Sequence, residues 1–338
     1  MIGEKMNKKK EFKLVLAPMA GVTNRAYRQL IRETNFEAVD IIFTEMINAT
    51  GISRLDNGTL NLLPDWDESC FVQIYGNNAL DLSRAADYIL TNYSKVEGID
   101  VNAACPVRKV VRNGSGSALL HDPDKLKEII KQLRIIVEGT GKSLSIKIRK
   151  GWEGYENYLE VINICDQLGV DFVSFHGRTV EQMYSGNADM TVLDKIKTER
   201  CEVFWTGDVF SVESIQNIAE YSDVVSGILF ARGTFGNPWI ISDAKEVLNG
   251  REPKSITLQE KIDTIRRHVE LLLEDYSPLK ALGQFKRFIA GYTKGIRDVR
   301  QKRNAIYRMN DLNELVELLI TTISADYDDE PGKICSSK

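Results

Sequence analysis

Eight short apolar runs, each followed by a longer amphipathic segment, constrain this fold more than any other feature of the sequence. They span Lys13–Ala17, Ile41–Thr44, Phe71–Ile74, Ile99–Asn102, Leu144–Ile148, Phe172–His176, Val203–Thr206 and Val224–Phe230. The runs are continuous instead of alternating, which is typical of parallel strands buried on both faces. Eight strand–helix units in about 240 residues predict an α/β fold of the (β/α)8 TIM-barrel type. A doubly wound open sheet is the structural alternative.

The segments between the runs carry helical patterns. We expect helices over Arg25–Thr34, Leu80–Asn92, Pro123–Val137, Tyr155–Leu168 and Val212–Tyr221. A longer gap follows the fourth strand, and the other strands start about 20 to 30 residues apart, which is the rhythm of a barrel.

A polar break at residues 250–256 ends the repeating pattern. Thr257 and Glu260 then form a capping-box pattern at the start of a helix. Two or three further helices can be read up to Ser324, so a small helical domain is expected after the barrel. The predicted organisation is a polar tail at 1–11, the barrel at 12–249, the helical domain at 256–324 and a second flexible tail at 325–338.

Composition excludes several classes of protein. The 338 residues are 43% hydrophobic and 27% charged, as in soluble globular proteins. No apolar stretch approaches the roughly 20 residues that cross a bilayer. The five cysteines are scattered without a C-x-x-C pair, and the three histidines lie far apart. We therefore expect no disulfide framework, no metal site, and a cytoplasmic location.

Polar or conformationally special residues follow every predicted strand. In strand order they are Pro18, Met19, Ala20 and Gly21; Glu45; Gln73; Asn102 and Cys105; Lys147 and Arg149; His176 and Arg178; Gly207 and Asp208; and Arg232 and Gly233. Each has an ordinary explanation alone, such as a satisfied buried histidine. Because active sites of TIM barrels lie at the carboxyl ends of the strands, their joint occurrence predicts a catalytic rim.

Glycines near the last two strands refine this prediction. Gly207, Gly227 and Gly233 permit close approach of the backbone to a ligand. Loops after the seventh and eighth strands of such barrels frequently bind phosphate through backbone N–H groups. A phosphorylated cofactor is therefore expected.

The segment from Ser277 to Asn310 is strongly basic within an acidic chain. It holds nine basic residues and one acidic residue, Asp298, whereas the whole chain has a net charge of −4. The basic residues are Lys280, Lys286, Arg287, Lys294, Arg297, Arg300, Lys302, Arg303 and Arg308. Such a run is either a solvated helix face or a surface for a polyanion.

These motifs resemble the tRNA-dihydrouridine synthase family, most closely its bacterial B branch. The similar segments are Ala17–Arg28, Val72–Gly76, Ile99–Leu120, Ile146–Trp152, His176–Asp189, Thr206–Ser211, Phe230–Trp239 and Phe285–Arg297. The resemblance runs from about residue 14 to residue 303. It implies reduction of the C5–C6 double bond of uridine in tRNA, with FMN as the cofactor and NADPH as the reductant.

The resemblance also implies roles for individual residues. Cys105 matches the cysteine that supplies a proton, and Asn102 matches a residue that binds the uracil. Residues matching the cofactor site are Pro18, Met19, Ala20, Gln73, Lys147, His176, Gly207, Asp208, Arg232 and Gly233. Arg178 matches a contact to tRNA or substrate, and Lys286 and Arg287 are expected to bind tRNA phosphates.

Two departures and two alternatives accompany this interpretation. Thr206 replaces a usual asparagine, and Ala104 replaces a common glycine before the cysteine. A flavin barrel enzyme acting on a small pyrimidine-like or enone substrate is the main alternative, although it would not need a basic helical domain. A non-catalytic RNA-binding barrel is the other, and the joint presence of Cys105, Asn102, Lys147 and His176 argues against it.

Overall fold

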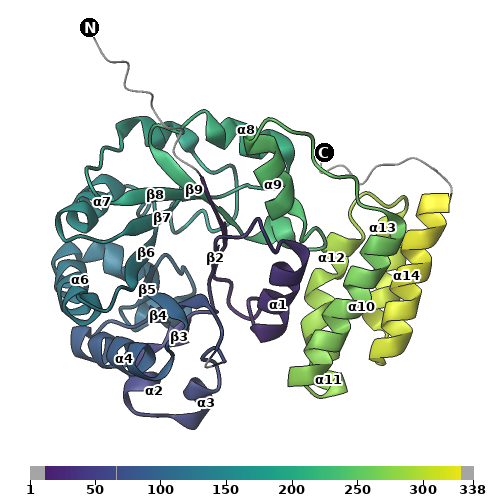
Figure 1. Ribbon diagram of the computed structural model, residues 1–338, viewed down its shortest axis with the longest axis horizontal. Coiled ribbons are helices and arrows are strands. Elements are labelled where there is room, and N and C mark those ends of the chain that lie inside the picture. Colours follow the sequence, from purple (N-terminus) through teal and green to yellow (C-terminus); the bar gives the residue numbers. More distant parts are fainter. Residues whose placement is uncertain (1–11, 66, 329–338) are drawn as a thin grey trace, which may run out of the picture.

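The structure is a computed structural model that describes residues 12–65 and 67–328. Its centre is one sheet of parallel strands, surrounded by helices, with a helical unit at one side (Figure 1). The strands are β1 (Lys13–Leu16), β2 (Ile41–Ile42), β3 (Ile47–Asn48), β4 (Cys70–Tyr75), β5 (Val96–Ala103), β6 (Ser143–Arg149), β7 (Phe172–His176), β8 (Glu202–Thr206) and β9 (Val225–Phe230). All eight predicted strands are present, and β3 is an addition.

The sheet closes on itself, so the barrel prediction is confirmed and the open doubly wound sheet is wrong. The strand order is β2-β1-β9-β8-β7-β6-β5-β4-β3. Phe43, directly after β2, forms a parallel bridge with Phe71 of β4 and joins the two ends. The second strand is interrupted between residues 43 and 46, and β3 resumes the pairing with β4.

Helices cover the outside of the barrel. They are α1 (Arg25–Thr34), α2 (Ala49–Ser53), α3 (Asn57–Leu60), α4 (Ala79–Asn92), α5 (Arg108–Arg112), α6 (Pro123–Val137), α7 (Tyr158–Gln167), α8 (Val212–Ala219) and α9 (Ile240–Leu248). Short 3-10 turns lie at Gly116–His121, Met190–Lys195 and Arg232–Thr234. The long gap after the fourth strand therefore contains α5, a 3-10 turn and α6.

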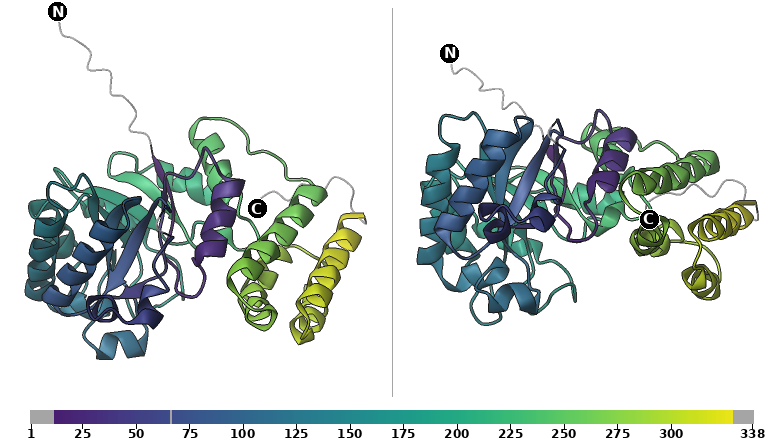
Figure 2. Two further views of the ribbon diagram at one scale, coloured as in Figure 1. Left: turned by 60° about the horizontal axis from the view of Figure 1, so that its bottom comes forward. Right: turned by 90° about the horizontal axis from the view of Figure 1, so that it is seen from below.

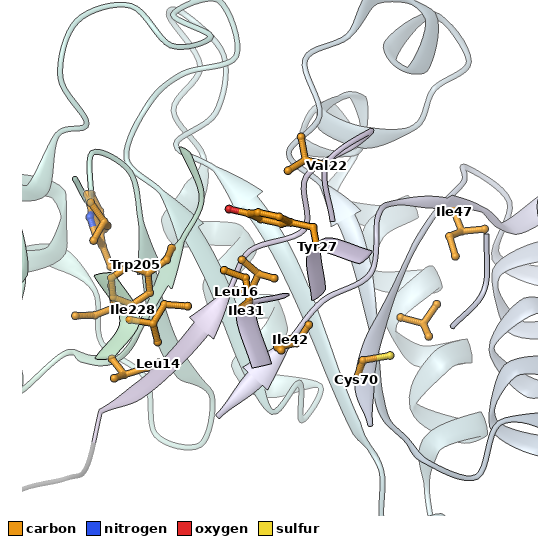
Figure 3. Close-up of a cluster of buried hydrophobic side chains, with 14 of the residues drawn as sticks. Leu14, Leu16, Val22, Tyr27, Ile31, Ile42, Ile47, Cys70, Trp205 and Ile228 are labelled. Carbon is orange, nitrogen blue, oxygen red and sulfur yellow. The ribbon is translucent and has the colours of Figure 1, made fainter. Parts of the chain in front are cut away.

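Alternate side chains of the strands point outward into an apolar layer beneath these helices. Leu14 and Leu16 of β1 and Ile228 of β9 belong to one large core cluster with Tyr27 and Ile31 of α1 (Figure 3). All five side chains are buried. Burial of this layer drives the helices onto the strands, because apolar burial is the main favourable term in folding.

Inside the barrel, four phenylalanines form a plug towards the amino ends of the strands. Phe172 stacks on Phe204 with ring centroids 4.3 Å apart, and Phe43 lies 5.3 Å from Phe71. Phe71 and Phe172 are 5.5 Å apart and connect the two pairs. Because the plug fills this end, polar side chains nearer the carboxyl ends can surround a cavity open only on that side.

The helical unit contains α10 (Leu258–Asp275), α11 (Pro278–Phe285), α12 (Ile289–Tyr292), α13 (Val299–Arg308) and α14 (Leu312–Asp328), with a 3-10 turn at Lys286–Phe288. The predicted capping box is present. Thr257 Oγ1 accepts a hydrogen bond from the Glu260 backbone N–H, and the Glu260 carboxylate accepts one from the Thr257 backbone N–H. Helix α14 extends past Ser324. Within this extension, Asp326 is buried and accepts a hydrogen bond from the Arg297 backbone N–H. Residues 325–328 are thus helical, and the rest of both predicted tails lies outside the described residues.

The helical unit packs directly on the barrel through α10 and α1, as both views of Figure 2 show. An aromatic cluster forms part of this junction. Tyr27 of α1 lies 4.7 Å from Phe288, and His268 of α10 lies 4.5 Å from the same ring. Tyr27 also donates to Thr234 Oγ1 at 2.8 Å. Within the described residues, no helix is long and apolar enough to cross a membrane.

The phenylalanine plug leads to a prediction about Gly98 of β5. A Cβ on Gly98 would lie 2.6 Å from the backbone oxygen of Ser143 and would also meet the Phe71 ring. Gly98→Ala should therefore destabilise the fold by about 1–3 kcal/mol, the usual cost of overpacking. Unfolding in urea measures this change in the free energy of unfolding. Gly283→Ala is the control: it meets nothing within 4 Å in α11, and should be neutral or stabilise by up to ~1 kcal/mol. Equal stability of both variants would contradict the plug.

Candidate active site

A cavity of about 450 Å³ opens at the carboxyl ends of the barrel strands. Most of the residues predicted for the site share it. Those lining it are Pro18, Met19, Ala20, Gln73, Asn102, Cys105, Lys147, His176, Gly207, Asp208, Arg232 and Gly233. Arg178, Lys286 and Arg287 do not line it. The tertiary structure thus brings predicted residues from seven strand ends to one chamber, while the role of each remains a prediction.

A chain of hydrogen bonds crosses the floor of the cavity. Ser145 Oγ donates to Asp100 Oδ1 at 2.6 Å, and Gln73 Nε2 donates to Asp100 Oδ2 at 2.6 Å. Asn102 Nδ2 donates to Gln73 Oε1 at 2.8 Å. Asn102 Oδ1 in turn accepts from the backbone N–H of Cys105 at 2.9 Å. The chain therefore links a buried carboxyl group to the loop that carries the thiol.

Asp100 sets the direction of this chain. Its carboxyl group is fully buried, and burial raises its pKa to about 6, opposed by the hydrogen bonds from Ser145 and Gln73. At neutral pH the carboxylate only accepts hydrogen bonds, so the NH₂ group of Gln73 must face it. The Gln73 oxygen then faces Asn102, whose oxygen is left for the Cys105 backbone.

Lys147 carries an unpaired positive charge into the cavity. Its ammonium group has no hydrogen bond or ion pair to any residue that the structure describes. Burial, together with the charge of the neighbouring Arg149, lowers its pKa to about 8, although Asp100 acts in the opposite direction. A lysine in this state would be stabilised by an anion, because an opposite charge compensates its lost hydration.

His176 is held neutral beside Lys147. Burial lowers the pKa of its imidazole well below the usual value, and the charge of Lys147 adds to the effect. Its Nε2 lies 3.2 Å from the guanidinium Nη1 of Arg178, which can only donate. Nε2 therefore accepts, and the proton of the neutral ring resides on Nδ1.

Arg149 was seen at the rim but was not predicted as a site residue. It lines the cavity and donates to the backbone oxygen of Ala104 at 3.0 Å and to that of Met183 at 2.9 Å. It thus connects the Cys105 loop to the loop after β7. The sequence does carry a signal for Arg149, because it follows Lys147 by two residues and therefore lies on the same face of β6.

Cys105 is half-buried and lines the cavity. Burial raises the pKa of its thiol; the Val107 backbone N–H, Arg149 and Lys147 oppose this rise without cancelling it. The thiol is therefore protonated at neutral pH. Such a group can donate a proton, whereas a nucleophilic cysteine needs a depressed pKa.

Arg178 lies behind the cavity wall, with 2% of its surface exposed. It donates to Asp208 Oδ1 and Oδ2 at 2.8 and 2.7 Å, and to the backbone oxygen of Gly186 at 2.6 Å. In this structure the side chain is occupied by the protein itself, so it holds the turn containing Asp208. A direct contact with tRNA has no support in this geometry.

Backbone shape at the end of β8 and β9 depends on glycine. Gly207 has φ +130°, a value that residues with a side chain rarely adopt. A Cβ on Gly233 would strike the backbone oxygen of Val209.

Nearby, the exposed Arg232 stacks over the Tyr184 ring at 4.3 Å and the Phe210 ring at 5.5 Å. Sequence reasoning missed both rings, because exposed loop aromatics have no periodic signal.

Both basic residues predicted to bind tRNA contact other parts of the protein. Lys286 Nζ donates to the Tyr307 backbone oxygen at 2.8 Å. The Arg287 guanidinium contacts Gly21, in the loop that lines the cavity. It also helps to stabilise the carboxylate of Glu45, whose pKa burial raises. Arg287 therefore connects the helical unit to the rim.

The state of the Cys105 thiol can be tested by its rate of alkylation by iodoacetamide against pH, with mass spectrometry identifying the modified peptide. Because burial raises the pKa, the rate should have its midpoint above the value of an ordinary thiol, about 8.5. Arg149→Met removes the nearby cation that stays charged at such a pH, and it should move the midpoint higher. A wild-type midpoint below 8 would instead identify a thiolate nucleophile.

The chain is similar to known proteins of one family. The family model "Dihydrouridine synthase (Dus)" matches residues 15–326. A "tRNA-dihydrouridine synthase B" from Pasteurella multocida is 30% identical over 305 residues, covering 87% of this chain and 88% of that protein. A "Probable tRNA-dihydrouridine synthase" from Aquifex aeolicus is 29% identical over 312 residues, covering 91% and 95%.

Two solved structures share the fold alone. Histamine dehydrogenase from Rhizobium sp. 4-9 has a TM-score of 0.52 at 11% identity, covering 93% of this chain and 62% of that one. The old yellow enzyme from Trypanosoma cruzi has a TM-score of 0.50 at 8% identity, covering 74% and 91%. The family model spans most of the chain and includes every residue that lines the cavity. The resemblance read from the motifs is confirmed, and the chain belongs to the dihydrouridine synthase family.

Proposed function

We propose that this protein reduces the C5–C6 double bond of uridines in tRNA to dihydrouridine, with FMN as its cofactor and NADPH as the reductant. One observation carries the proposal: the same cavity contains the ammonium group of Lys147, which has no partner among the described residues, and the protonated thiol of Cys105. The first fits a cofactor that becomes anionic, and the second fits a substrate that needs a proton. The names of the relatives support tRNA as the substrate.

The residues present fit FMN. The cavity of about 450 Å³ is within the usual range for small-molecule sites, and it is lined by Lys147, which has no partner among the described residues. The glycine cradle at Gly207 and Gly233 leaves no room for side chains where a phosphate would approach. When bound, FMN supplies hydride to the substrate. Lys147 and His176 would hold the ring edge, Gln73 would hydrogen-bond the ring, and Pro18, Met19 and Ala20 would pack against it.

The phosphate end would lie at Gly207, Asp208, Arg232 and Gly233. A carboxylate beside a phosphate is unfavourable unless its charge is compensated. The two hydrogen bonds from Arg178 compensate Asp208, so its backbone can face an anion. Arg232 is exposed at the rim and can approach the phosphate directly. This assigns Arg178 a positioning role in place of the predicted tRNA contact.

Substrate chemistry would take place at the mouth of the cavity. We propose that the second N–H of Asn102 donates to the uracil, because its only contact in the described structure is a weak one to Met46 Sδ at 3.5 Å, while Gln73 and the Cys105 backbone hold the rest of the amide. Addition of hydride at C6 leaves negative charge at C5. The Cys105 thiol gives its proton to C5, and the charges of Arg149 and Lys147 stabilise the resulting thiolate.

The helical unit would bind the RNA backbone. The exposed basic residues in its segment 277–310 are Lys280, Arg287, Lys294, Arg297, Arg300 and Arg308. Phosphate contacts from such residues position RNA without reading its sequence. The target uridine must leave its stack to enter the cavity, so base flipping is expected.

The described cysteines are all free, which agrees with a reducing, cytoplasmic setting.

Cys105→Ala tests the chemical role. Turnover should fall by about 10²–10⁴-fold, the usual contribution of a positioned acid, while flavin absorbance stays unchanged. The assay is nucleoside mass spectrometry of unmodified tRNA incubated with protein, FMN and NADPH. Cys201→Ala, a buried cysteine outside the cavity, is the control and should keep activity. Loss of flavin from the Cys105 variant would contradict the role, and turnover of free pyrimidines without tRNA would favour the small-substrate alternative.

Charge reversal tests the RNA surface. Lys294→Glu with Arg300→Glu should weaken tRNA binding and flatten the dependence of affinity on salt, because fewer counterions are released. These two exposed residues are better probes than Lys286 and Arg287, whose side chains contact the protein. Filter binding at several salt concentrations measures the effect. Lys127→Glu, on the exposed face of α6, is the control. Equal affinity of the double variant and wild type would remove this face from the interface.

A further inference from the structure

A second cavity of about 390 Å³ lies between the barrel and the helical unit, outside the candidate active site. We call it the junction pocket. It is lined by α1, α9, the linker before α10, and α10 itself. Five carboxylates line it: Glu33, Asp243, Glu246, Glu260 and Asp263. Trp239 contributes an aromatic ring to the same wall.

Three of the five carboxylates have cationic partners. Glu33 accepts from Arg267 at 2.8 Å, Glu246 from Arg251 at 2.8 Å, and Glu260 from Lys254 at 2.6 Å. Asp263 accepts only from the neutral amide of Gln259, at 2.8 Å. Asp243 has no hydrogen bond or ion pair from its side chain to any residue that the structure describes. Two negative charges in the junction pocket are therefore uncompensated.

Asp243 is the less ordinary of these two residues. Its side chain is buried, with 9% exposure, and burial raises its pKa to about 6. It lies in the first turn of α9, where the helix dipole favours an acidic residue. That benefit is available to an exposed residue as well, and does not explain why this one is buried without a partner. A buried, unpaired carboxylate costs free energy that a bound cation would recover.

The surroundings favour an organic cation over a metal ion. No group of three or more His, Cys, Asp or Glu side chains among the described residues has the arrangement of a metal site. Trp239 brings an indole ring to the lining, and an ammonium group over the face of an indole is attracted to it. Carboxylate and aromatic groups together are the chemistry that recognises an alkylammonium.

We propose that the junction pocket binds a small aliphatic diamine, with one ammonium group on Asp243 and Trp239 and the other on Asp263. The two charges of such a ligand equal the two that the protein leaves uncompensated. Because Asp243 belongs to the barrel and Asp263 to the helical unit, the ligand would bridge the two parts. The proposal does not depend on the reaction at the other cavity.

Isothermal titration calorimetry of the full-length protein at pH 7.5 and low salt tests this site, with 1,4-diaminobutane as the probe. Wild type should bind it, and Asp243→Asn and Asp263→Asn should each weaken binding by about tenfold or more, because one charge pair is lost. Asp87→Asn, on the exposed face of α4, is the matched control and should bind as wild type does. n-Butylamine, with one charge, should bind more weakly than the diamine.

Thermal unfolding provides a second measurement that does not depend on calorimetric heat. The diamine should raise the Tm of wild type and leave that of Asp243→Asn unchanged. Without ligand, Asp243→Asn should be at least as stable as wild type, since it removes a buried unpaired charge. Equal binding by wild type and Asp243→Asn would overturn the proposal. So would equal binding of n-butylamine, or an equal rise in Tm from sodium chloride at matched ionic strength.

Discussion

The buried carboxyl group of Asp100 is the interaction on which the arrangement of the catalytic cavity depends. It lies inside the barrel, above the phenylalanine plug, where an ionised group must be satisfied by hydrogen bonds. Ser145 and Gln73 provide them. The direction of these bonds then determines the orientation of Gln73, of Asn102 and of the Cys105 loop. Asp100 also partly offsets the cost of placing Lys147 close by.

The cavity also shows how buried cations can be tolerated. Arg178 is paired with Asp208, and Arg149 is satisfied by backbone oxygens, so neither needs a ligand. Lys147 alone has no partner in the described structure. Its neighbour His176 accommodates this by remaining neutral. The result is a cavity lined both by a cationic side chain without a partner in the described structure, Lys147, and by a neutral thiol, Cys105.

The helical unit is attached firmly to the barrel instead of being tethered by the linker alone. Tyr27, His268 and Phe288 pack at the junction, and Arg287 reaches the Gly21 turn of the cavity loop. If the helical unit binds the RNA backbone as proposed, this attachment would let those contacts place one base at the cavity. Burial lowers the pKa of His268 to about 3. The ring is therefore uncharged near neutral pH, and no buried charge disturbs this contact.

Much of this architecture was readable from the sequence, because strands and helices leave periodic signals. All eight strand runs and the Thr257–Glu260 capping box were identified, and the residues that follow the strands led to the cavity. The second strand's interruption was not visible, since β3 is only two residues long. Asp100 was passed over because a single carboxylate inside an apolar run gives no hint of its partners. Tyr184 and Phe210 were missed because loop positions carry no period.

The sequence by itself determined the fold class, the family and the group of side chains at the strand ends, because hydrophobic periodicity and motif spacing are properties of the chain. Only the tertiary structure decided which of those side chains meet a ligand and which meet one another. Arg178 and Lys147 looked alike in the sequence, yet one is neutralised by Asp208 and the other faces the cavity unpaired. The junction pocket likewise exists only because folding brings α1, α9 and α10 together. Pairing and burial depend on distance in space, which residues far apart in the chain do not reveal.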